Sequence, residues 1–248
     1  LVALWVWTLR EPSRKNAKLS ASGGHAQLGI GATVRELTQR AGSVLGISFG
    51  QMVQAITLYA FMLWAPVFFQ RVHGWTAQQT GTRLGLVVLF GGCIGMYFGG
   101  RLADRWLGAG RRDAALRVGA ISAFGGFLAF GASALAHASP LLTLALFLPG
   151  VAMLAMPAGS LYAALQMILP NQVRGQAVAF YLFVANLGGL TLGPLVPALL
   201  NDYVFESEAA VGTSLTLTLT CATLIASAVF ASALGSYRRD YERMHPTR

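Results

Sequence analysis

The chain has 248 residues, of which 55% are hydrophobic and 11% are charged, and its formal net charge is +9. Because soluble domains carry about 25% charged residues, this composition indicates an integral membrane protein. The basic residues lie between apolar segments and form no basic face with interleaved aromatic residues, which argues against a nucleic-acid partner. The two cysteines, Cys93 and Cys221, lie far apart within apolar segments, so we expect neither a disulfide framework nor a metal site.

The first part of the chain, residues 1–42, precedes the long apolar segments. Residues 1–9 are apolar but would reach only about 14 Å as a helix, so we interpret them as the end of a truncated transmembrane helix. Residues 10–42 are expected to form a cytoplasmic linker, flexible where Ser, Ala, Gly and Lys are frequent. Within this linker, residues 33–40 are predicted to form a short surface helix with Thr33 as its N-cap.

Six segments are long and apolar enough to cross a bilayer core of about 30 Å as helices. They contain no Asp, Glu, Lys, Arg or His, and backbone polar groups in lipid must be paired internally. The predicted fold is therefore an all-α membrane protein, with a six-helix bundle over residues 43–237 and a cytoplasmic tail over 238–248. The expected spans are residues 43–69, 84–100, 118–136, 141–169, 176–200 and 211–237.

The charge of the connecting segments alternates along the chain. All 18 Lys and Arg residues except Arg71 and Arg83 fall on one side of the six predicted spans. The positive-inside rule assigns that side to the cytoplasm. We therefore expect the basic loops and the C-terminus to be cytoplasmic.

Glycines and prolines are placed regularly within the spans. Glycines at four-residue spacing share one face of a helix and allow two backbones to approach closely, as static packing and a rocking interface both require. Proline inside a membrane helix permits a bend, which serves as a gate or only shapes the helix. The predicted packing and hinge residues are Gly91, Gly95, Gly99, Pro157, Gly193 and Pro194.

A few polar side chains lie inside the predicted spans. Because a buried amide or hydroxyl is costly in lipid unless paired, each should either bond a neighbouring helix or face a substrate path. The candidates for a substrate cavity are Gln51, Gln54, Thr57, Tyr162, Gln166, Tyr181 and Asn186. No ionisable side chain lies within the spans, so a proton site for coupled transport would have to lie elsewhere.

The most informative motif is expected in a short charged loop between the second and third spans. Residues 100–105 (GRLADR), followed by Gly110, Arg111 and Arg112, resemble the cytoplasmic motif G-x-L-A-D-R-x-G-R-R of the major facilitator superfamily. The spacer before Gly110 is three residues longer than in that pattern. The likeness is strengthened by three further stretches: residues 169–179, residues 186–189 with Gly193 and Pro194, and residues 201–203. Together they resemble the spinster-like group of this superfamily. The residues assigned to a cytoplasmic gate are Gly100, Asp104, Arg105, Arg111 and Arg112.

The resemblance implies a twelve-helix fold of two six-helix halves around a cavity that opens alternately to either side. This chain would be the C-terminal half, and its partner the missing N-terminal half. Asp104 would then cap a helix N-terminus of the other half, where the dipole favours an anion. The alternative is that the arginine cluster only sets topology.

The resemblance implies a secondary transporter in a membrane, by expectation the bacterial inner (plasma) membrane. It would move a small organic solute or an amphipathic lipid by alternating access, with membrane lipid as its other partner. The alternatives are a non-transporting scaffold or receptor module, and a half-size six-span transporter that acts as a dimer. No HExxH, GxSxG or P-loop pattern occurs, so we predict neither an enzyme nor a bound cofactor or metal.

Overall fold

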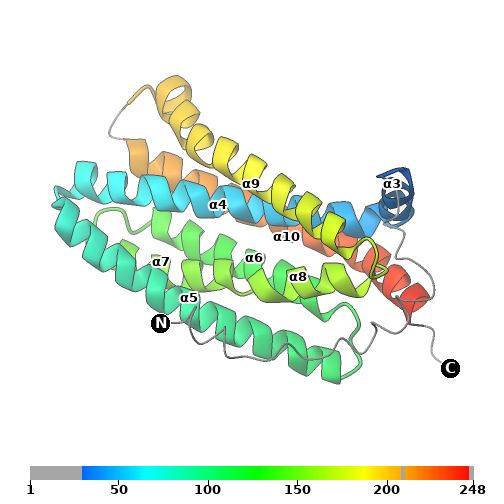
Figure 1. Cartoon of the computed structure of the whole chain (residues 1–248). Coiled ribbons are helices and arrows are strands. Elements are labelled where there is room, and N and C mark those ends of the chain that lie inside the picture. The colour runs from blue at the N-terminus through cyan, green and yellow to red at the C-terminus, as the bar shows by residue number, and fades with distance from the viewer. Residues whose placement is uncertain (1–29, 208–209, 246–248) are drawn as a thin grey trace, which may run out of the picture.

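The structure is a computed structural model that describes residues 30–207 and 210–245, and within these ranges all regular elements are helices (Figure 1). Residues 1–9 and the first part of the predicted linker lie outside the described residues. The helices are α3 (Ile30–Gln39), α4 (Ala41–His73), α5 (Ala77–Gly108), α6 (Ala114–Ala134), α7 (Pro140–Ala155), α8 (Ala158–Met167), α9 (Arg174–Leu199), the π-helical η1 (Leu200–Phe205) and α10 (Val211–Met244).

Six helical segments in the described ranges are long and apolar enough to cross a membrane, which confirms the predicted six-helix bundle. Helices α7 and α8 together make the fourth segment, and α9 with η1 makes the fifth. Helix α10 continues through residues 238–244, which were predicted to belong to the tail. It remains helical there because Asp240 is buried and accepts a hydrogen bond from Ser43 of α4.

Two local predictions are wrong. Residues 100–107 do not form a loop but complete the last two turns of α5, because Ala103 still packs as a buried residue of that helix. The connection to α6 is confined to residues 109–113, and Gly110 supplies its left-handed conformation with φ of +81°. Thr33 is not the N-cap of the surface helix, because α3 already begins at Ile30.

Helix ends away from the arginine cluster follow local sequence signals. Thr76 begins α5 with a reciprocal capping box in which Gln79 is the partner. Ser139 accepts a hydrogen bond from the backbone of Leu142, and Pro140 occupies the first turn of α7. Gly74 ends α4 in the left-handed conformation with φ of +65°. These signals place tight turns between long apolar helices.

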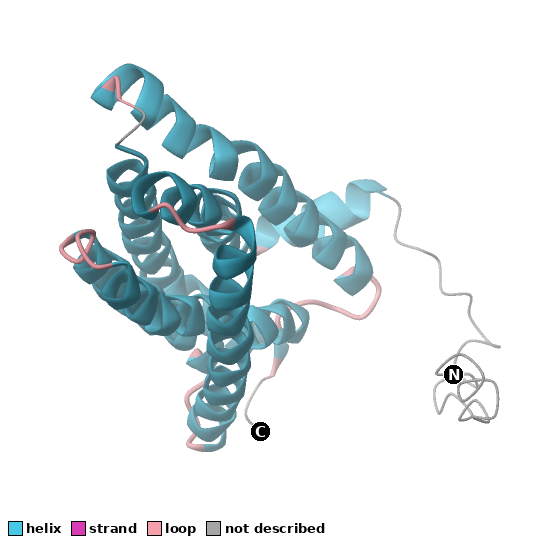
Figure 2. Ribbon diagram, turned by 90° about the vertical axis from the view of Figure 1, so that its left-hand side faces the viewer, coloured by secondary structure: helices cyan, strands magenta, loops and turns pink. Residues whose placement is uncertain are grey.

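The spanning helices pack in the order α9, α4, α10, α6, α7 with α8, and α5. Figure 2 shows this helical bundle turned by 90° from the view of Figure 1. We call the end where α4 begins and α10 ends the basic end. One apolar cluster at this end joins α4, α6, α8, α9 and α10, and includes Ile47, Leu165 and Phe230. A second cluster at the opposite end joins α4, α5, α6, α7 and α10 around Phe61 and Phe147. The middle of α4 therefore lies between these two apolar clusters.

The prolines act differently in different helices. Pro157 separates α7 from α8, whereas Pro194 lies inside the continuous helix α9. Pro197 is also helical, and the chain turns π-helical three residues later. Because proline lacks an N–H, Pro197 leaves the carbonyl of Gly193 without its usual helical partner. Pro66 inside α4 was not noted from the sequence.

Candidate functional site

A cavity of about 240 Å³ lies between the middle of α4, α5 and the α7–α8 break. Gln51 and Gln54 contribute its polar side chains, and both were candidates from the sequence. The other lining residues are Ala55, Leu58, Phe61, Met62, Val88, Gly92, Met96, Val151, Leu154, Ala155 and Ala158. None of these lining residues is ionisable, so any ligand here meets two amides and an apolar wall.

Gln54 is the most unusual polar residue of this cavity. Its side chain is only 2% exposed, and neither its amide oxygen nor its amide nitrogen has a hydrogen-bond partner among the described residues. The amide oxygen of Gln51, one turn earlier, is also buried without a partner in the described part of the chain. A buried polar group left unpaired costs about 1–3 kcal/mol, so these amides are suited to a partner that the isolated bundle does not supply.

The other polar candidates do not line this cavity. Thr57 is fully buried and donates to the carbonyl of Val53 in its own helix. Asn186 lies on α9, where its amide oxygen accepts a hydrogen bond from Tyr59 of α4 at 3.1 Å. Its amide nitrogen donates to the carbonyl of Leu182 at 2.8 Å. The amide oxygen of Asn186 therefore joins α9 to α4, and its amide nitrogen is bonded within α9.

Tyr162, Gln166 and Tyr181 lie nearer the basic end. Tyr162 of α8 is 40% exposed, and its ring meets that of the buried Tyr181 on α9 edge-on, with centroids 6.5 Å apart. Gln166 is half-buried one turn beyond Tyr162 and lines none of the recesses described below. This pair of rings joins α8 to α9 rather than extending the central cavity.

The predicted glycines lie at close helix contacts. A Cβ added at Gly95 or Gly99 of α5 would overlap the backbone carbonyls of Ala152 and Met156. At Gly91 it would lie 3.1 Å from the Leu148 carbonyl oxygen. On α9, a Cβ at Gly193 would lie 2.7 Å from Cβ of Tyr59 on α4. These glycines permit the backbone approach of α5 to α7 and of α9 to α4.

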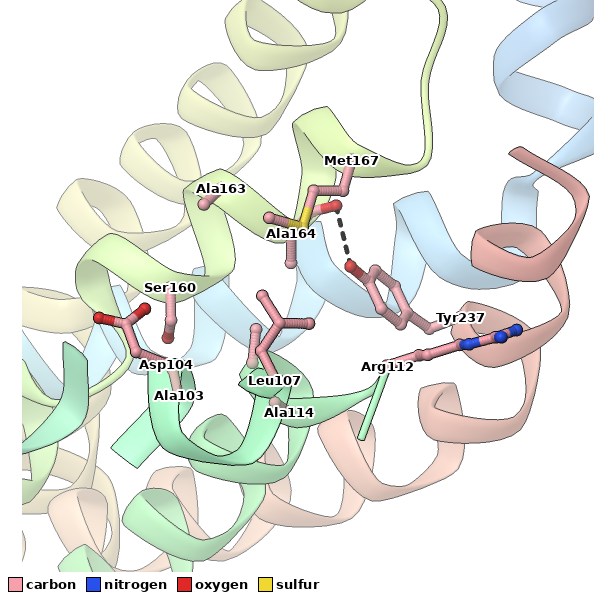
Figure 3. A pocket seen from close by; sticks show the side chains of 11 residues that line it. Ala103, Asp104, Leu107, Arg112, Ala114, Ser160, Ala163, Ala164, Met167 and Tyr237 are labelled. Atoms are coloured by element: carbon pink, nitrogen blue, oxygen red, sulfur yellow. Dashed lines mark hydrogen bonds between the residues drawn. The ribbon is translucent and has the colours of Figure 1, made fainter. Parts of the chain in front are cut away.

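Asp104 and Arg112 of the charged motif line a second recess, of about 60 Å³, at the basic end (Figure 3). Asp104 of α5 faces it from the side of Ser160 on α8, and Tyr237 of α10 closes it by donating to the Ala164 carbonyl. Asp104 has no ion-pair partner among the described residues, whereas Arg112 pairs with Glu242 at 3.4 Å.

The remaining motif residues point elsewhere. The guanidinium of Arg111 lies 5.6 Å from the ring centroid of Trp106, within cation–π range. Gly100 lines a neighbouring groove between α5 and α8, together with Asp104 and Ser160. Arg105 is exposed on the last turn of α5.

An ion-pair network missed in the sequence joins α6 to α10. Asp113 precedes α6, is 2% exposed, and accepts hydrogen bonds from Arg117 at 2.9 Å and Arg238 at 3.0 Å. Burial alone would raise the pKa of this carboxyl, but the two arginine hydrogen bonds outweigh burial and lower it. Asp113 and Arg238 are 125 positions apart, so no local pattern pointed to their pairing.

The sequence profile of the Major Facilitator Superfamily matches residues 1–194 and, in a second alignment, residues 47–240. Each match covers more than half of the chain. The chain belongs to the Major Facilitator Superfamily. Its six apolar helices and this family indicate an integral multi-pass membrane protein. No curated protein matches the chain.

Two solved structures share the superfamily fold with this chain. One is a bacterial homologue of the human lysosomal transporter Spinster in an inward-facing, unoccupied conformation, with a TM-score of 0.65 and 18% identity. The comparison covers 99% of this chain and 58% of that one. The other is a bacterial Spinster homologue in the occupied inward-facing conformation, with a TM-score of 0.54 and 17% identity over 96% and 54% of the two chains. This chain thus spans little more than half of these structures, as expected of half of a twelve-helix fold.

Proposed function

We propose that this chain forms one half of a secondary active transporter that works by alternating access, a non-enzymatic function. The observation that carries the proposal is the buried, unpartnered amide of Gln54 at a charge-free cavity in the middle of the bundle. Membership of the Major Facilitator Superfamily supports it. The amide is in a position to exchange an unpaired state for a hydrogen-bonded one when a substrate enters.

A second six-helix unit is the proposed partner of this chain. It would cover the open side of the central cavity and the groove that Asp104 lines. The unpaired Asp104 would cap a helix of that unit, while the basic end faces the cytoplasm of a bacterial inner membrane. Asp104→Asn in the complete protein is expected to lower the transport rate at unchanged expression, and wild-type transport by this variant would contradict the proposed gate.

The proposed substrate is a small organic solute or an amphipathic lipid with a neutral hydrogen-bonding group. The two cavity amides offer both donors and acceptors, and the remaining wall is aliphatic, aromatic and methionine-rich. A carboxylate or ammonium group would find no countercharge among the residues that line the cavity. This feature favours neutral polar groups over fully ionised ones.

The test is uptake by the complete protein that carries this chain, purified and reconstituted into liposomes. A radiolabelled monoacylglycerol and a radiolabelled sugar acid would serve as probes of the two solute classes. We expect uptake of the neutral amphipathic probe, and a loss of about 5–150-fold in Gln54→Leu, because leaving a polar substrate group unpaired costs about 1–3 kcal/mol. Gln166→Leu is the control, since this amide does not line the cavity. A well-folded protein that transports neither probe would favour the scaffold or receptor alternative.

A further inference from the structure

An apolar recess of about 380 Å³ adjoins the central cavity on the side away from the basic end. It is lined by Phe61, Met62, Pro66, Leu84, Gly85, Val88 and Leu89. The central cavity and this recess share Phe61, Met62 and Val88, so they form one trough along the seam between α4 and α5. We call this feature the α4–α5 trough. Its polar groups, Gln51 and Gln54, lie at one end only.

Two glycines of α5, Gly85 and Gly92, line this trough, and a side chain added at either would meet open space. A Cβ added at Gly85 or Gly92 would have no heavy atom within 4 Å, apart from its own helix and chain neighbours. Gly91 and Gly95 on the same helix meet α7 instead. Glycine inside a helix costs about 1 kcal/mol relative to alanine, and helix packing gives no reason for that cost at Gly85 and Gly92. Open space in the trough is what these two glycines provide.

We propose that Gly85 and Gly92 determine the bulk and length of the apolar group that the trough accepts, while Gln54 holds the polar end of the same molecule. This inference rests on the proposed transport function and deepens it. The occupant is a neutral molecule with one hydrogen-bonding group and an apolar chain. The amides that lack partners select the polar group, and the absence of ionisable side chains among the lining residues excludes a charged chain.

The two positions act at different depths. Gly92 lines the cavity that contains the amides, and Gly85 lies seven residues earlier, about 10 Å away along the helix axis. A large side chain at position 92 therefore obstructs every chain that starts at Gln54. A large side chain at position 85 obstructs only chains that reach beyond about 10 Å.

The experiment measures binding to the complete protein in lipid nanodiscs by calorimetry. The probes are straight-chain N-alkylacetamides of increasing length, whose amide matches the donors and acceptors of Gln54. Burial of each methylene group contributes about fourfold to affinity, so losing room for two of them weakens binding about 15-fold. We expect Gly92→Leu to lower the affinity for all probes by about this factor. Gly85→Leu should lower the affinity for the long probes only. Gly92→Ala, which adds one carbon, should cost about fourfold.

Gly81→Leu is the matched control, because Gly81 also has open space around an added Cβ but lines neither recess. Equal effects of leucine at positions 81, 85 and 92 would overturn the inference. It would also be overturned if Gly85→Leu and Gly92→Leu lower thermal stability without changing the length profile, since a helix of the partner half would then occupy the trough. Probe binding that is insensitive to Gln54→Leu would refute the proposed cavity as well. Sensitivity to Gln54→Leu with an unchanged length profile would refute the glycine assignment alone.

Discussion

Replacing Gln54 by methionine is expected to make the protein more stable while it removes substrate binding. Methionine has nearly the volume and flexibility of glutamine but no polar amide. In the described structure both polar atoms of the Gln54 side chain are buried and unpartnered, and the residue is 2% exposed. Removing a buried unpaired polar group returns about 1–3 kcal/mol of unfolding free energy.

This gain in unfolding free energy should be measurable as a rise in Tm. For chains of 150–250 residues, 1 kcal/mol moves Tm by about 2–4 °C, so Gln54→Met should raise Tm by roughly 2–12 °C. Thermal unfolding in detergent, followed by intrinsic tryptophan fluorescence, measures this shift without any ligand. Probe binding, measured on the same preparation, should be lost. Stability and binding are therefore expected to change in opposite directions.

Asn186→Leu is the matched comparison, because both polar atoms of this amide have partners in Tyr59 and Leu182. Its removal leaves the Tyr59 hydroxyl and a helix carbonyl with one bond fewer, and should lower stability by about 0.5–1.5 kcal/mol. The reasoning is refuted if Gln54→Met lowers Tm, or if the two substitutions shift Tm in the same direction by the same amount.

Three further predictions follow from packing and titration. Gly95→Ala should destabilise the bundle by about 1–3 kcal/mol, whereas Gly92→Ala should stabilise it by about 0.4–1 kcal/mol, as chemical denaturation would measure. Asp113→Asn should lower Tm at neutral pH. Because the pKa of Asp113 is lowered in the folded protein, the ionised carboxylate stabilises the wild type at pH values above the ordinary pKa of 3.8. This stabilisation is lost as pH falls below 3.8. Burial and the neighbouring His73 lower the pKa of His137, so wild-type Tm should fall as pH drops below 6.5, and His137→Gln should flatten that part of the profile. An unchanged profile in His137→Gln would contradict this assignment.

The spanning helices could be predicted from the sequence because lipid imposes a simple requirement on it. Each span must be about 20 apolar residues long, and the described part of the chain meets that requirement six times. The predicted ends of α5 and α10 were wrong, because outside the lipid the need for apolar residues no longer determines where a helix ends. Residues 101–107 remain helical because Ala103 still packs as a buried residue of α5. Helix α10 extends past Tyr237 because Asp240 is buried and accepts a hydrogen bond from Ser43.

The candidate site could be predicted only in part. Polarity within an apolar span identified Gln54, but it identified Thr57 and Asn186 equally well. These residues differ in their hydrogen-bond partners. Thr57 donates to its own helix, and Asn186 has partners on α4 and on its own helix. The Gln54 amide has no partner among the described residues. That property depends on how helices far apart in sequence are packed. The same holds for Asp113, whose partner Arg238 comes from the far end of the chain.

In the proposed alternating-access cycle, Gln54 lies between the two apolar clusters, and its unpaired amide would affect the balance between the conformations. Each cluster packs α4 against its neighbours at one end, and the unpaired Gln54 amide between them is a local energetic cost that a ligand is able to remove. A ligand shifts a conformational equilibrium only by the difference in its affinity for the two states. If the cavity is open to water in one state and closed in the other, water forms hydrogen bonds with the Gln54 amide in the open state. In the closed state only the substrate is able to do so. The closed state without substrate then retains the penalty of about 1–3 kcal/mol, which disfavours closure of an empty transporter by about 5–150-fold.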